Sequence, residues 1–190
     1  MSRALSNLED GRLVSPDQAA QTYEAILEER KHLQRGHLWG IQDIDDLLQP
    51  ASGGDMIVVA ARPSIGKTAL AAMLADHWAA TGKPVLFVSL EMSLAQLLDR
   101  ATARYGGLPT SQLRRGLLTD ADVAVQLGAA ERRRGVQVWY LDDPYATTAS
   151  VRAAAAKVKL LAGSLGAIVI DYLQLLKDAH EQEVQRVTRI

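Results

Sequence analysis

The segment AARPSIGKT occupies residues 60–68 of this chain. It nearly matches the phosphate-binding loop pattern G-x-x-x-x-G-K-[ST], but Ala61 stands where the pattern has its first glycine. The apolar run Met56–Ala60 precedes the loop and predicts a buried strand, and we expect a helix from Gly66 to about Ala80. A loop between a strand and a helix offers backbone N–H groups and a positive dipole end to phosphate. This order therefore predicts a nucleotide site.

The composition is that of an ordinary soluble globular protein. Its 190 residues are enough for one domain with a proper core. The formal net charge of −1 indicates no bulk preference for nucleic acid or for an anionic membrane, although a few basic side chains in one groove can still bind phosphate. The absence of cysteine excludes disulfides and thiolate zinc sites. No apolar run approaches the length of a membrane span, so we expect a cytoplasmic protein without a membrane partner.

Apolar runs alternate with helical stretches after the loop. Further strands are expected at Val85–Ser89, Val136–Leu141 and Ala167–Ile170. Further helices are expected at about Ser93–Tyr105, Thr119–Gly135 and Thr148–Gly163. Apolar strands separated by helices are typical of an α/β fold, with a mostly parallel sheet and helices on both faces.

A separate helix is expected ahead of this domain, from Ser15 to about Gln34. Ser15 can cap its N-terminus, a proline suits its first turn, and Gln18 completes a capping box. Its apolar stripe consists of Tyr23, Ile26, Leu27 and Leu33. A glycine break follows at Gly36. The residues alone support two hypotheses equally, packing of the stripe on its own domain and docking on a neighbouring subunit.

Polar and charged side chains follow three of the predicted strands. They are expected at the carboxyl edge of the sheet, where ligands bind in folds of this class. Lys67 can reach the β- and γ-phosphates, and the Thr68 hydroxyl can bind Mg²⁺. Glu91 follows the second strand, where it can take a proton from a water that attacks the γ-phosphate, or can simply be a charge at a helix start. Asp171 follows four apolar residues, which is the Walker B pattern for an aspartate that holds Mg²⁺ directly or through water.

These motifs resemble those of the DnaB-type replicative helicases, in the RecA-like branch of the P-loop ATPases. The similar stretches are AARPSIGKT, VLFVSLEMS and IVIDYLQLL, with WGIQDIDDLL before the first strand, LDDP after the third and EVQRVTR near the C-terminus. In this family an alanine at the first loop position is usual, so the resemblance implies a working loop. We expect that φ of Ala61 is not positive, whereas Gly66 lies where the backbone must come close to phosphate. Ile65 replaces the usual methionine of the family with little change of volume.

The resemblance also implies an activity. Members of the family form hexameric rings around single-stranded DNA and couple ATP hydrolysis to translocation, with ATP and Mg²⁺ bound between subunits and an arginine finger from the neighbour. The implied catalytic residues are Lys67 and Glu91, and the implied metal-binding residues are Thr68 and Asp171. The implied nucleotide-binding loop consists of Ala61, Arg62, Pro63, Ser64, Ile65, Gly66, Lys67 and Thr68. The N-terminal helix matches the family's linker helix, which favours docking on an adjacent subunit. Primase and a helicase loader are further implied partners.

The resemblance predicts an N-terminal segment with the linker helix at 1–35 and a partial RecA-like ATPase domain at 36–190. The chain stops at Ile190, inside the expected helix after Walker B, so we expect a fold that is incomplete at the C-terminus. The family's next strand lies between the Walker A and Walker B strands and carries a polar sensor. Without that strand, a gap with unpaired backbone groups is expected in the sheet.

Two functions stay open. The chain is either a piece of a helicase motor, or a short RecA-like paralogue that binds nucleotide and joins an assembly without translocating. A recombinase-like or clock-type ATPase is disfavoured, because the pairing of ARPS-x-GKT with SLEM points elsewhere.

Other chemically suggestive residues are expected to have structural roles. The four histidines lie far apart and lack metal-ligand spacing. Trp78 and Trp139 are expected to pack in the core or at an interface. The run Arg132–Arg134 is interpreted as a solvated helix end, and Asp142 and Asp143 as turn formers before a proline.

Overall fold

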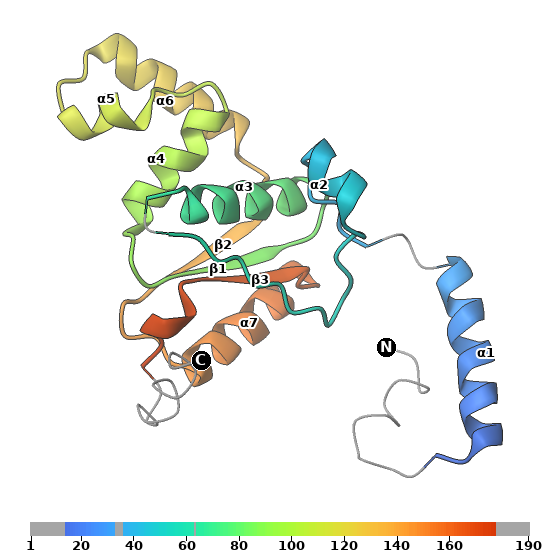
Figure 1. Ribbon diagram of the computed structural model, residues 1–190. Coiled ribbons are helices and arrows are strands. Elements are labelled where there is room, and N and C mark those ends of the chain that lie inside the picture. The colour runs from blue at the N-terminus through green and yellow to red at the C-terminus, as the bar shows by residue number, and fades with distance from the viewer. Residues whose placement is uncertain (1–13, 33–35, 63, 178–190) are drawn as a thin grey trace.

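The computed structural model describes residues 14–32, 36–62 and 64–177 (Figure 1). Its helices are α1 (Pro16–His32), α2 (Gln42–Leu47), α3 (Lys67–Ala80), α4 (Leu94–Arg104), α5 (Thr110–Arg115), α6 (Asp120–Arg132) and α7 (Thr148–Ala162). Its strands are β1 (Val85–Ser89), β2 (Val138–Asp142) and β3 (Ala167–Asp171), and a 3₁₀ helix, η1, spans Leu173–Leu175. Leu33, Pro63, His180 and the motif EVQRVTR lie outside the described residues.

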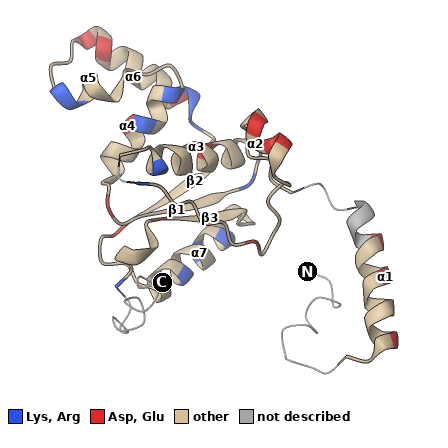
Figure 2. Ribbon diagram, in the orientation of Figure 1, with Lys and Arg blue, Asp and Glu red and all other residues tan. Residues whose placement is uncertain are grey.

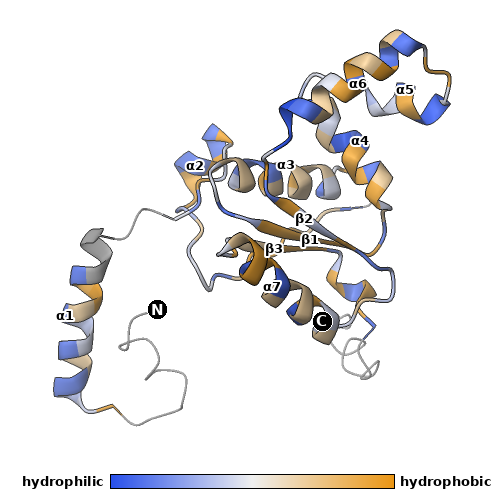
Figure 3. Cartoon of the chain, turned by 180° about the vertical axis from the view of Figure 1, so that it is seen from behind, coloured by the Kyte–Doolittle hydropathy of each residue, from blue (hydrophilic) through white to orange (hydrophobic). Residues whose placement is uncertain are grey.

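The strands form a parallel sheet in the order β2-β1-β3, with β1 in the centre. Every residue of β1 is buried. Val85 and Phe87 belong to the apolar cluster that contains α3, whereas Leu86 and Val88 belong to the cluster that contains α7. Figure 1 shows α3 and α7 on opposite faces of the sheet, and Figure 3 shows the hydrophobic strands between them. The predicted α/β class, with a parallel sheet covered on both faces, is confirmed.

The prediction of a first strand at Met56–Ala60 is wrong. This segment is not part of the sheet, and the side chains of Met56 and Val58 are 80 % and 75 % exposed. A strand needs a neighbour to receive its backbone hydrogen bonds, and in the described part of the chain β3 pairs only with β1. A strand between this segment and β3, which the resemblance implies, is not among the described residues. The segment therefore remains apolar in sequence but exposed in structure.

The predicted helix starts are confirmed where local side chains decide them. The Ser15 amide donates to Gln18 Oε1 at 3.1 Å, and the Gln18 amide donates to Ser15 Oγ at 3.3 Å. Capping boxes also begin α4 at Ser93 and α6 at Thr119. The helices α2 and α5 were not predicted, because six residues are too few to show a helical period.

Two tryptophans tie the segment before the loop to α3. Trp39 and Trp78 are both buried, with ring centroids 6.1 Å apart. The Trp78 indole N–H donates to the Leu38 carbonyl at 2.8 Å, and the Trp39 indole N–H donates to the Gln49 carbonyl at 3.1 Å. The expected core packing of Trp78 is confirmed. In the described part of the chain, no helix is long and apolar enough to span a membrane.

Arg133 is not solvated, so the interpretation of its run as an exposed helix end is wrong at this position. Its side chain is only 11 % exposed and donates to Asp76 Oδ1 at 2.8 Å and to the Tyr140 hydroxyl at 2.6 Å. Asp76, on α3, is 5 % exposed and also pairs with Arg104 of α4. Burial raises the pKa of the Tyr140 phenol, so its hydroxyl stays protonated. The neighbouring Arg134 is exposed, as predicted.

This cluster anchors the helical extension formed by α4, α5 and α6, which projects from the sheet (Figure 1). Figure 2 shows basic and acidic residues together on this extension. Arg104 reaches α3 from α4, and Arg133 reaches it from the segment after α6. A buried carboxylate held by two guanidinium groups therefore sets how the extension lies against α3.

Asp76→Ala is expected to lower the free energy of unfolding by about 3 kcal/mol or more, because it leaves the Arg133 guanidinium without its counter-charge. Urea denaturation followed by circular dichroism measures this change. Glu131→Gln is the matched control, since it breaks an ion pair with Arg134 whose side chains are 81 % and 62 % exposed. The control should cost about 0.5 kcal/mol or less. Equal losses in the two variants would contradict the structural role of Asp76.

Candidate functional site

The loop that carries the phosphate-binding pattern ends at the N-terminus of α3. Lys67 is the first residue of this 14-residue helix, and Gly66 is its N-cap, with φ of 110° and no side-chain capping bond. A Cβ at Gly66 would meet no atom within 4 Å, so the backbone conformation, and not crowding, requires glycine here. The first N–H groups of α3 are therefore free of a side-chain cap and directed at the space where an anion can bind.

The alanine at the first loop position causes no strain. Among the described residues, Ser64 is the one non-glycine residue with positive φ, at 66°, and Ala61 does not share that conformation. This agrees with the expectation for Ala61. The left-handed conformation of Ser64 was not predicted, since the pattern places no constraint on that position. Ala61, Arg62, Ser64 and Ile65 are exposed.

Lys67 meets the end of β3. Its Nζ lies 3.8 Å from Asp171 Oδ1, and the Asp171 side chain is 4 % exposed. The same Nζ lies 4.2 Å from the centroid of the Tyr172 ring. The structure thus brings together the lysine of the loop and the aspartate of the Walker B pattern, which are far apart in sequence. A role for Tyr172 was not predicted, although its position directly after Asp171 was an available signal.

Glu91 and Thr68 lie at the same edge of the sheet. Thr68 follows Lys67 in the first turn of α3 and is partly buried. Glu91 is exposed in the turn between β1 and α4, and it forms no hydrogen bond or ion pair with another described residue. Its preceding residue, Leu90, donates its amide to the Asp171 carbonyl at 3.0 Å. The turn that carries Glu91 is therefore attached to the backbone of Asp171.

Asp142 fixes the other end of the same turn. Its Oδ2 accepts from the Leu94 amide at 3.1 Å, at the start of α4. Asp143 Oδ1 accepts from the Tyr145 amide at 2.9 Å, which confirms turn formation for Asp143. The contact of Asp142 was not predicted, because Leu94 lies 48 residues away in the sequence.

The residues present fit a magnesium ion bound together with a nucleotide. No group of three or more His, Asp or Glu side chains in the described ranges could hold a metal ion alone. A nucleotide-bound Mg²⁺ needs only one or two protein ligands, because phosphates and waters complete its shell. The Thr68 hydroxyl and the Asp171 carboxylate are oxygen donors of the required kind. Thr68 directly follows Lys67 in α3, and Asp171 Oδ1 lies 3.8 Å from Lys67 Nζ.

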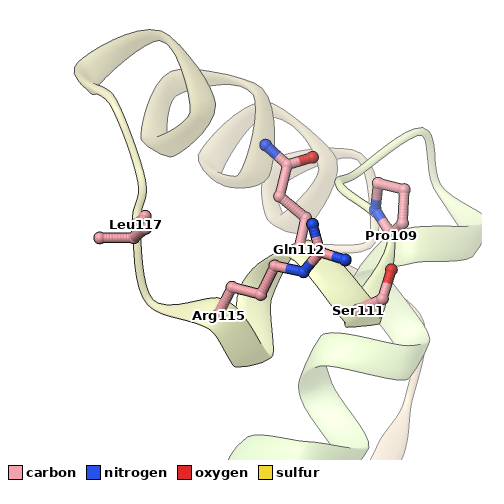
Figure 4. A pocket seen from close by; sticks show the side chains of 5 residues that line it. All are labelled: Pro109, Ser111, Gln112, Arg115 and Leu117. Atoms are coloured by element: carbon pink, nitrogen blue, oxygen red, sulfur yellow. The ribbon is translucent and has the colours of Figure 1, made fainter.

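A pocket lies elsewhere, at α5 (Figure 4). It is lined by Pro109, Ser111, Gln112, Arg115 and Leu117. None of the residues predicted for the nucleotide site contributes to it, so it gives no information about phosphate chemistry.

Residues 36–190 match the family model described as the DnaB-like helicase C terminal domain. The chain belongs to this family. The predicted resemblance to DnaB-type helicases is therefore confirmed. This DnaB-like chain is 35 % identical over 184 residues to the replicative DNA helicase DnaC of Bacillus subtilis (strain 168), which covers 91 % of the chain and 40 % of that protein. It is 36 % identical over 153 residues to the replicative DNA helicase DnaB of Nostoc sp., which covers 80 % of the chain and 17 % of that protein.

The fold also has solved counterparts. The ATPase domain of G40P superposes with a TM-score of 0.73 at 22 % identity, covering 92 % of this chain and 66 % of that one. A DnaB-like replicative helicase, described with its interactions with primase, gives 0.69 at 20 % identity, covering 98 % and 47 %. At these identities the likeness concerns the fold alone, and it confirms the RecA-like class. The DnaB-like chain spans 40 % or less of the two sequence relatives named above.

Gly66→Ala is expected to weaken Mg–ATP binding about tenfold or more, because alanine at φ of 110° strains the loop or displaces it. A titration with a fluorescent ATP analogue measures the affinity. Gly163→Ala is the matched control, since Gly163 has φ of 78°, also has no atom near a built Cβ, and caps the distant end of α7. Thermal unfolding should show a similar small loss in both variants. An equal loss of affinity in both would contradict a specific role of Gly66.

Proposed function

We propose that this chain is the ATP-driven motor part of a replicative DNA helicase, which hydrolyses ATP and couples this to movement along single-stranded DNA. The observation that carries the proposal is the meeting of Lys67 and Asp171 beside the N-terminus of α3, 3.8 Å apart, in a member of the DnaB-like family. The sequence relatives are replicative DNA helicases, which favours the motor over a paralogue that does not translocate.

The loop residues have distinct roles in this proposal. The amides at the start of α3 and the Lys67 ammonium bind the β- and γ-phosphates, where positive charge offsets the charge of the transferring group. Thr68 and Asp171 hold Mg²⁺, which neutralises phosphate charge when bound. Lys67 Nζ lies 3.8 Å from Asp171 Oδ1, so with Mg²⁺ held by Asp171 the ammonium would be available to the phosphates.

Glu91 acts as the general base. Its carboxylate is exposed beyond β1, in a turn attached at both ends to neighbours of the site, Leu90 to Asp171 and Leu94 to Asp142. It takes the proton of the water that attacks the γ-phosphorus, while the bond from that phosphorus to the bridging oxygen breaks and leaves ADP. An arginine from a neighbouring subunit completes the charge stabilisation in this proposal.

The N-terminal helix provides the assembly contact in this proposal. Figure 1 shows α1 apart from the sheet and its covering helices, and Tyr23 and Leu27 are exposed on it. An isolated helix of 17 residues is marginal in water, so its apolar stripe needs a surface to cover it. We propose that this surface belongs to an adjacent copy in a hexameric ring. The family match that begins at residue 36 supports a boundary between a linker segment at 1–35 and the motor at 36–190.

The remaining partners follow from the same proposal. A replicative motor works in the cytoplasm on single-stranded DNA, and primase and a helicase loader are its proposed protein partners. One solved DnaB-like helicase is described together with its interactions with primase, which supports the first of these two.

Two variants should distinguish Mg–ATP binding from ATP hydrolysis, because each is expected to impair a different step. Lys67→Ala is expected to weaken Mg–ATP binding about tenfold or more, because the phosphates lose a charged partner. Glu91→Gln should bind nearly normally but release phosphate about 10²–10⁴-fold more slowly in assembled protein with single-stranded DNA. Lys157→Ala removes an exposed lysine from α7 and is the control for loss of charge. Unchanged affinity in Lys67→Ala would show that the nucleotide site is assigned wrongly.

The stripe on α1 is testable through assembly. Replacing both Tyr23 and Leu27 by serine should weaken self-association about tenfold or more, as measured by sedimentation velocity, because an apolar contact is lost. Gln21→Ser combined with Ala25→Ser is the matched control, since these residues lie on the opposite side of the same helix. Nucleotide affinity of the isolated chain should not change in either pair. Self-association that the stripe variant leaves intact would argue for another assembly surface.

A further inference from the structure

Tyr172 has no role in the function proposed above, yet its ring is a direct partner of the Lys67 ammonium. Nζ lies 4.2 Å from the ring centroid, and its one ion-pair partner in the described ranges is Asp171, with Oδ1 at 3.8 Å. A separation of 3.8 Å is too long for a hydrogen bond. The ammonium is therefore attracted by the Asp171 charge and by the Tyr172 ring face, and it forms no hydrogen bond with the carboxylate.

The backbone around Tyr172 keeps the ring in place. Tyr172 follows the last residue of β3, which pairs with Ser89 of the buried central strand. It is also the N-cap of η1, and its carbonyl accepts from the Leu175 amide at 3.1 Å. The residue thus sits between two hydrogen-bonded elements, and its side chain is partly buried. A ring held in this way can act as a fixed surface for a mobile side chain.

A ring face is a suitable partner for a lysine that must later bind phosphate. The carboxylate of Asp171 competes with phosphate for the ammonium, because both are anions. The ring attracts the cation through its quadrupole without carrying a charge, so it can stay in contact when an anion approaches from the other side. A lysine side chain loses much rotamer freedom when it is ordered, and a partner already present in the free protein lowers that cost on binding.

We infer that Tyr172 is a positioning residue for the nucleotide site, whose ring face holds the Lys67 ammonium at the start of α3 before and during phosphate binding. The inference rests on the proposed function of the loop. It requires the aromatic face and not the hydroxyl. Phenylalanine should therefore replace tyrosine, whereas leucine, an apolar residue without a π face, should not.

Affinity is the first test. In the full chain, Tyr172→Leu is expected to bind Mg–ATP about threefold to tenfold more weakly than wild type, whereas Tyr172→Phe should remain near the wild-type value. Tyr145→Leu, at an exposed tyrosine, controls for the loss of an aromatic residue. Tyr172→Met is a second variant without a ring, which protects the result against local misfolding of the leucine variant. Thermal unfolding and the amide spectrum establish that each variant folds.

The second test needs no nucleotide. The ring current of Tyr172 should move the Lys67 Hε resonances upfield, and these are assigned by comparison with Lys67→Arg. The displacement should persist in Tyr172→Phe and disappear in the leucine and methionine variants. A role in folding alone would not separate the variants in this way.

The outcomes are distinct. If wild-type binding depends on Lys67 but is unchanged in Tyr172→Leu, the role of Tyr172 is overturned and the proposed function stands. Equal losses in the phenylalanine and leucine variants would also overturn it, because the ring face would then not be the active feature. Absence of Mg–ATP binding by the wild-type chain would overturn both. A loss confined to the variants without a ring, together with the loss of the Lys67 shift, would establish the inference.

Discussion

β1 is buried at every position, and both other strands of the described sheet pair with it. Because the pairing is parallel on both sides, the carboxyl ends of the strands meet at one edge. Asp142, Asp171 and the turn that carries Glu91 therefore lie together, joined by the bonds from Leu94 and Leu90. The candidate site exists because one fully buried strand organises this edge.

The loop itself depends on α3 more than on the strand expected before it. Met56–Ala60 lies outside the sheet, so the loop is fixed at its C-terminal end, where it joins α3. On that side α3 is fixed by Trp78, which packs on Trp39, and by Asp76, which pairs with Arg104 and Arg133. The position of the Lys67 ammonium, at the start of the same helix, follows from this packing. The helical extension and the nucleotide site are therefore connected through one rigid element.

Local patterns predicted much of this fold. Cap residues and apolar periodicity located the starts of α1, α4 and α6, and the structure shows that each of these helices begins with a capping box. Apolar runs located β1 and β3 correctly, and β2 with a shift of its ends. The loop pattern and the apolar run before Asp171 were enough to predict that Lys67 and Asp171 belong to one site. The distance between their side chains was not predictable.

Elements whose causes lie within a few residues were predictable from the sequence: helices, their caps, apolar strands and the loop with its required glycine. Whether each of these elements has a partner depends on contacts between distant segments. The run Met56–Ala60 has the composition of a strand but pairs with no described strand. The sequence predicts a surface charge at Arg133, but its guanidinium donates a hydrogen bond to Asp76, which is 57 residues away in the sequence. Tyr172 contacts Lys67 only because β3 ends beside α3. Pairing, charge compensation and ring contacts depend on distance in space, which residue type and spacing do not specify.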